Sequence, residues 1–210
     1  MRRKHHRKLR DFERQEAATA QAILASSERL ARRMRETLDQ ASESARRAEK
    51  EYRENAFAQF WDAVEQLARQ LDSFNQVVRQ LSYNAQRYYM SAKDRQDTFP
   101  SFCIRSEALP NPAPVLAELH RIVRMGQTNF QFAWIWEQRK TREVLIAGFR
   151  TLGEAIDNLG STIEHSMSQL ASGVAQLVEE QIRTRETIDT QAREHGRMLD
   201  NIQRHRKPPF

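Results

Sequence analysis

Apolar residues recur along the chain with the spacing of a helix seam. Between residues 57 and 88 the steps alternate between three and four without a miss, which is the 3.5-residue repeat that keeps one side of a helix apolar. The residues of this seam are Phe57, Phe60, Val64, Leu67, Leu71, Phe74, Val78, Leu81, Ala85 and Tyr88. The pattern predicts a long helix that packs against another helix.

Two further seams follow the first. One contains Leu116, Leu119, Val123, Gly126, Phe130 and Ala133, and the other contains Leu145, Phe149, Leu152, Ile156, Leu159 and Ile163. Between them the register slips near residues 137–141. Upstream, residues 13–52 have a thinner seam that becomes alanine-rich at Ala41, Ala45 and Ala48 before Tyr52. Alanine buries little area but lets two helices approach closely.

The helix-breaking residues divide the chain unevenly. All six prolines lie at residue 100 or later and all six glycines at residue 126 or later, so residues 1–99 contain neither. We therefore expect a basic tail over 1–12, a long helix over 13–97, a proline-containing loop over 98–111, a helix over 112–203 that glycines could kink, and a basic tail over 204–210. Asn111 before Pro112 is typical of a helix start.

These elements predict an all-α fold in one of two arrangements. In the first, two long helices form an elongated antiparallel coiled-coil hairpin, in which facing residue numbers sum to about 209. Phe60 would then face Phe149, the alanine stretch 41–48 would face the bulky residues 159–167, and both tails would lie at one tip, opposite the proline loop. In the second, the helix over 112–203 breaks near a glycine and the chain forms a three- or four-helix bundle.

Charge is concentrated at the two ends. The first ten residues carry six basic side chains and no acidic one, residues 204–210 carry three more, and the whole chain has a net charge of +6. The intervening residues therefore have a net charge of −3. The candidate residues for binding an anionic surface are Arg2, Arg3, Lys4, Arg7, Lys8, Arg10, Arg204, Arg206 and Lys207. Neither tail contains the residues that read base sequence.

The segment 130–136, FQFAWIW, concentrates rings in a chain that is only 8% aromatic. On a helix, Phe130 and Trp134 share one face, while Phe132 and Trp136 share another about 200° away. One partner helix cannot cover both faces. We therefore assign these four residues, together with Trp61, to an assembly interface in which the second face contacts further helices of this chain or of another copy. A recognition patch for a different protein and a base-stacking platform are the alternatives.

The sequence contains no recognisable catalytic, cofactor or metal site. The six histidines are not paired at ligand spacing, and no glycine-rich loop precedes a Lys with Ser or Thr. The single cysteine, Cys103, excludes an intramolecular disulfide, and we expect it to be a small packing side chain rather than a nucleophile. No apolar run approaches the ~18 residues that span a bilayer.

Together these features predict a non-enzymatic coiled-coil scaffold or tether. We expect it to self-associate and to engage an acidic partner or surface through its basic termini, without a cofactor or small-molecule substrate. Another protein, an anionic membrane surface or nucleic acid could be that partner. A nonspecific nucleic-acid-binding protein is the alternative function. A reducing, cytoplasmic setting is expected, and a peripheral position at a membrane stays open.

Overall fold

A computed structural model of the chain describes residues 2–92, 100–139 and 152–205. These residues form α1 (Arg2–Arg53), α2 (Phe57–Ala92), a short 3-10 helix η1 (Ser106–Ala108), α3 (Ala113–Thr128), α4 (Phe130–Arg139) and α5 (Leu152–His205). No strand occurs in these three ranges. The all-α class predicted from the sequence is therefore confirmed.

The chain turns back at residues 54–56, where the sequence predicted an uninterrupted helix over 13–97. Asn55 adopts a left-handed conformation with φ of 55°. The N–H of Ala56 donates to the carbonyl of Glu51 at 2.9 Å, and the N–H of Asn55 donates to that of Tyr52 at 3.2 Å. This pair of bonds is the Schellman motif, which closes a helix at a left-handed Gly or Asn. The prediction of one helix over 13–97 is therefore wrong.

α1 and α2 consequently form an antiparallel pair, which is the most extensive helix interface among the described residues. The amide of Asn84 on α2 donates to the hydroxyls of Ser26 and Ser27 on α1, each at 3.3 Å. All residues of the seam from Phe60 to Tyr88 are buried, as is the alanine stretch of α1. The two seams thus pack within the first half of the chain rather than between its halves.

The segment predicted as one helix over 112–203 is also divided. α3 begins at Ala113, whose N–H donates to the side-chain oxygen of Asn111 at 3.0 Å, and it ends at Thr128. Asn129 is extended, and its side-chain oxygen accepts a bond from the N–H of Gln131 at 3.1 Å, which caps the start of α4. α5 follows from Leu152.

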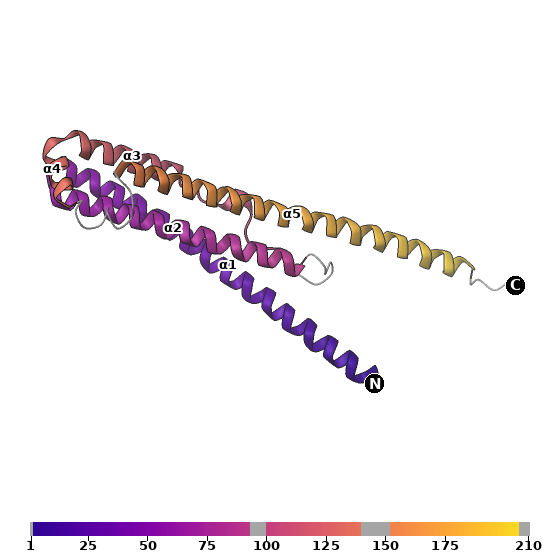
Figure 1. Ribbon diagram of the computed structural model, residues 1–210. Coiled ribbons are helices and arrows are strands. Elements are labelled where there is room, and N and C mark those ends of the chain that lie inside the picture. Colours follow the sequence, from indigo (N-terminus) through magenta and orange to yellow (C-terminus); the bar gives the residue numbers. More distant parts are fainter. Residues whose placement is uncertain (1, 93–99, 140–151, 206–210) are drawn as a thin grey trace.

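The helices form a bundle in which α1 runs antiparallel to α2, and α3 runs antiparallel to α5 (Figure 1). α5 packs mainly against α2, and α3 packs mainly against α1, whereas α1 and α5 make no contact among the described residues. The predicted pairing of alanines 41–48 with residues 159–167 is therefore wrong, since these segments belong to helices that do not meet. Phe149, the predicted partner of Phe60, lies outside the described residues.

The molecule is elongated, and two helices extend past its packed part. The N-terminal half of α1 and the C-terminal half of α5 project from the same end and diverge (Figure 1). The opposite end contains the turn at Asn55 together with α4 (Figure 1). The proline loop was expected at that tip. Instead it lies along the side of the bundle, where the Cys103 thiol approaches the Leu24 carbonyl at 3.8 Å.

Candidate functional site

An aromatic cluster joins the turn at Asn55 to α4. Its rings belong to Tyr52, Phe57, Phe60, Trp61, Phe132 and Trp136, with neighbouring centroids 4.6 to 5.6 Å apart. The indole N–H of Trp61 donates to the carbonyl oxygen of Phe132 at 2.8 Å in the buried interior. A buried indole needs such a partner, because an unpaired polar group in the core is costly. This bond fixes α4 relative to α2.

Gly126 on α3 makes room for this cluster. A Cβ added there would lie 2.7 Å from Cε1 of Phe60 and 2.9 Å from two atoms of the Trp61 ring. Such distances are shorter than van der Waals contact, so only glycine fits without movement of the rings. The sequence placed Gly126 in a helix seam, and the structure shows that its role there is close approach of the two rings.

The segment FQFAWIW therefore divides into a buried and an exposed pair. Phe132 and Trp136 are 0% and 8% exposed, whereas Phe130 and Trp134 are 82% and 58% exposed. The sequence placed Phe130 in the apolar seam, and that placement is wrong. The seam assumed one continuous helix, but extended Asn129 rotates α4 relative to α3 and brings Phe132 inward.

Three of the five predicted interface residues thus belong to the interior of a single chain. Trp61, Phe132 and Trp136 cannot contact a second molecule without opening the bundle. Phe130 and Trp134 remain on the surface of α4, at the end of the molecule away from both termini (Figure 1). A contact of this exposed pair with another chain stays a prediction.

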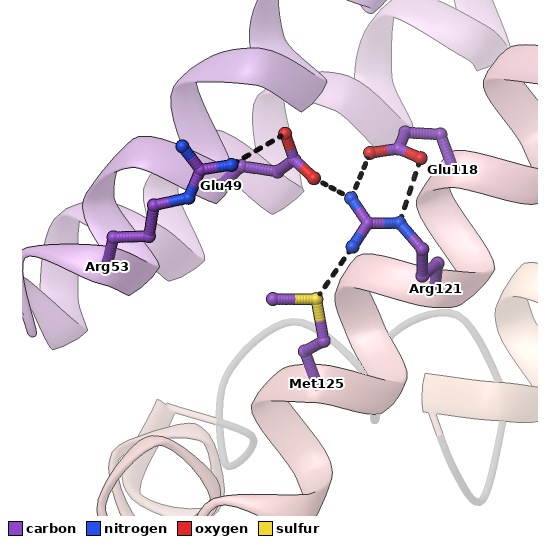
Figure 2. Close-up of polar contacts among 5 residues, drawn as sticks. All are labelled: Glu49, Arg53, Glu118, Arg121 and Met125. Atoms are coloured by element: carbon purple, nitrogen blue, oxygen red, sulfur yellow. Dashed lines mark hydrogen bonds and ion pairs between the residues drawn. The ribbon is translucent and has the colours of Figure 1, made fainter.

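Arg121 connects α3 to α1 through a group of polar side chains. Its guanidinium forms ion pairs with Glu49 of α1 and with Glu118 of its own helix, and it contacts the sulfur of Met125 at 3.1 Å (Figure 2). Glu49 also faces Arg53 at 3.8 Å. Because the Arg121 side chain is about half exposed, solvent screens these pairs and each contributes little stability. Their role is to orient α3 along α1.

The loop after residue 99 is held against α1 and α2. The hydroxyl of Tyr88 donates to the carbonyl of Pro100, and the rings of Tyr88 and Phe102 lie 5.4 Å apart. Burial, with a smaller effect of Cys103, raises the pKa of Tyr88 to about 12. Burial and then the Glu28 carboxylate raise the pKa of the Cys103 thiol as well. A thiol with a raised pKa forms less thiolate, which argues against a nucleophilic role.

Seven of the nine predicted anion-binding residues lie on the two projecting helices. Arg2, Arg3, Lys4, Arg7, Lys8 and Arg10 all fall in the first turns of α1, and Arg204 falls in the last turn of α5. Arg206 and Lys207 lie outside the described residues. The segment predicted as an N-terminal tail is therefore helical from Arg2 onward. The free ends of α1 and α5 lie at the same end of the molecule but diverge, whereas the hairpin predicted them side by side (Figure 1).

Within 2–92, 100–139 and 152–205, no group of three His, Cys, Asp or Glu side chains is placed to hold a metal ion. None of the helices in these ranges is long and apolar enough to cross a membrane. Comparison of the chain with protein-family models, curated proteins and solved structures finds no match.

Proposed function

We propose that the chain is a non-enzymatic helical scaffold or tether that self-associates and engages an acidic partner or surface through its basic ends. The observation that carries this proposal is the arrangement of the termini. The two helices that bear the basic segments extend past the packed bundle at one end (Figure 1). A charged partner could therefore approach both segments without displacing any packed helix.

The start of α1 combines two sources of positive potential. Its first turn contains no acidic residue and begins with Arg2, Arg3 and Lys4. The helix dipole adds a partial positive charge at the same end. Basic side chains at this position destabilise an isolated helix, and a bound anion relieves that repulsion. Helical spacing also puts positions 3, 7 and 10 along one side of α1.

Exposed apolar side chains support self-association. Besides Phe130 and Trp134, Tyr83 and Met90 on α2 are 60% and 67% exposed. Large exposed apolar groups are typical of surfaces that contact another protein. A tether of this kind would hold its partner at one end and contact other protein molecules along its length.

Binding to anionic lipid vesicles tests the charged ends. The variant Arg2→Gln, Arg3→Gln, Lys4→Gln removes three charges from the projecting tip, and the control Arg32→Gln, Arg33→Gln, Arg35→Gln removes three from the exposed surface of the same helix. Because each basic residue near an anionic surface contributes about 1 kcal/mol, we expect the tip variant to bind roughly 100-fold more weakly by vesicle cosedimentation. The control should bind close to wild type.

The same variants are to be measured with duplex DNA over a range of salt. Vesicle binding that depends on the three basic residues at the tip supports a membrane-surface tether. DNA binding that falls steeply with salt supports the alternative, a nonspecific nucleic-acid-binding protein. Equal losses in both variants would show that net charge, and not the projecting end, drives binding. Absence of binding to either probe would overturn the proposed role of the basic ends.

A further inference from the structure

A groove of about 640 Å³ runs along the outer surface between α2 and α5. Its walls include Arg79, Tyr83, Gln86 and Tyr89 from α2, and His165, Gln169, Ser172, Gly173 and Gln176 from α5. The two helices run in the same direction along it (Figure 1). Exposed Met90 continues the α2 wall by one further turn. The groove is long and open, a shape that suits a helix better than a small molecule.

Gly173 is not needed for close packing among the described residues. A Cβ added there would meet no atom within 4 Å, in contrast to Gly126, where the rings of α2 occupy the space. Glycine inside a helix is unfavourable, and at Gly173 the open space lies beside the groove, where another helix would fit. Next to it, Ser172 is also small and is exposed. These two positions would let the backbone of another helix approach closely.

The stripe of α5 along the groove can pair with the same stripe of a second copy when the two helices are antiparallel. The residues of α5 that line the groove recur at helical spacing, His165, Gln169, Ser172 with Gly173, and Gln176, and Glu180 continues the stripe by one turn beyond the groove. In an antiparallel pairing of two α5 helices with facing numbers that sum to 345, Ser172 faces Gly173. Gln169 then faces Gln176, and His165 faces Glu180. A two-fold symmetric interface requires this reciprocity, because residue i contacts j while j contacts i.

The charges and exposed rings along the groove agree with this pairing. The described residues that line the groove include no carboxylate, and Arg79 lies at the same end as His165. In the antiparallel arrangement, the half-buried Glu180 of the second copy lies at the end of the groove that contains Arg79 and His165, and its carboxylate faces both side chains. Because α2 runs parallel to α5, the same symmetry brings Tyr83 towards Met90 of the second copy and covers two exposed apolar side chains.

We propose that two copies of this chain associate through the α2–α5 groove, with their α5 helices antiparallel and crossing at Ser172 and Gly173. This inference rests on the self-association in the proposed function and specifies its surface. The occupant is a second copy because the stripe is self-complementary in charge and size. The crossing keeps the two α5 ends, and with them the basic termini, pointing in opposite directions.

Blocking the crossing point tests the interface. The variant Gly173→Gln fills the groove floor, and Gly196→Gln makes the same change on the same helix, where an added Cβ also meets no atom within 4 Å. Both replacements improve helix propensity, so circular dichroism should show folded protein in each case. By sedimentation equilibrium we expect the dimer dissociation constant to rise more than about tenfold in Gly173→Gln and to stay unchanged in Gly196→Gln.

The register is tested by single cysteines in a Cys103→Ser background. Ser172→Cys would lie next to its symmetry mate within the reach of a disulfide and should form covalent dimers on mild oxidation. The matched control Ala175→Cys replaces another small residue on the exposed surface of α5 but outside the groove, and it should form no covalent dimer under the same conditions. Equal yields from the two cysteines would overturn the proposed crossing.

A charge exchange separates direct pairing from general destabilisation. Glu180→Lys should weaken the dimer, and addition of His165→Glu should restore at least part of the lost affinity. A wild-type dimer that survives Gly173→Gln would overturn the groove interface while leaving self-association intact. A wild-type chain that is monomeric at every concentration would overturn both the interface and the self-association on which it rests.

Discussion

Gly126 lies where the rings of Phe60 and Trp61 come closest to α3. Gly126→Ala should lower the free energy of unfolding by about 1–3 kcal/mol, because the added methyl group overlaps both rings. Gly196→Ala, in open space on α5, should raise it by up to about 1 kcal/mol, since alanine is the better helix former. Urea unfolding of the two variants measures this difference in sign. Stabilisation by both substitutions would show that the rings do not lie against α3.

The buried hydroxyl of Tyr88 makes the stability of the fold depend on pH in the alkaline range. Burial raises its pKa from 10.0 to about 12, so the folded chain holds the phenol proton more tightly than the unfolded chain. The resulting stability is present below pH 10 and is lost as the pH rises from 10 towards 12, because the unfolded chain then ionises first. At most, the loss is roughly 3 kcal/mol.

This dependence is measured in a Cys103→Ser background, which removes the thiol whose pKa is also raised. Urea midpoints at pH 9 and pH 11 should differ less in Tyr88→Phe than in the parent. Tyr83→Phe removes an exposed tyrosine and should keep the parent's difference. If the urea midpoint of Tyr88→Phe changes between pH 9 and pH 11 as much as that of the parent, the buried environment of this hydroxyl is contradicted.

At the scale of the helices, the turn at Asn55 decides which surfaces meet. Asn55 is left-handed, so Asn55→Gly should leave stability unchanged or slightly higher, and Asn55→Ala should lower it by about 1 kcal/mol. A continuous helix predicts the reverse order, because alanine stabilises a helix interior and glycine weakens it. Thermal or urea unfolding of the two variants distinguishes these orders directly.

The sequence predicted the buried faces better than the points where the chain turns. Regular spacing identified the buried seam from Phe60 to Tyr88, because each packed helix repeats its apolar positions. The turn at Asn55 has no Gly or Pro to mark it. Its one signal is the step of five between Tyr52 and Phe57, which interrupts the alternation of three and four.

The sequence also could not predict which face of FQFAWIW is exposed or where the α2–α5 groove lies, because both depend on where the chain turns. Helical spacing correctly separated FQFAWIW into two faces, but the step of four from Gly126 to Phe130 suggested the wrong one as buried. The extended conformation of Asn129 reverses that choice, and it depends on how α4 packs on Trp61. The α2–α5 groove could not be predicted either, since it requires α2 and α5 to run side by side.

At the scale of the whole molecule, the turn at Asn55 converts a two-helix rod into a bundle with an accessible α2–α5 surface. The predicted hairpin and the observed bundle both bring the free ends of α1 and α5 to one end of the molecule (Figure 1). They differ in the partner of α1, which is α2 in the structure and the C-terminal half of the chain in the long hairpin. The groove and the aromatic cluster exist only in the bundle.

The distance between Arg29 and Gln80 tests this bundle most directly. Both side chains are exposed, and the antiparallel pairing of α1 with α2 puts their positions nearly opposite each other. Spin labels at these two positions in a Cys103→Ser background, diluted with unlabelled protein, are measured by pulsed electron resonance. The bundle predicts a separation below roughly 25 Å, about the width of two packed helices with their labels. A separation of about 77 Å, the length of roughly 51 residues of continuous helix, would contradict it.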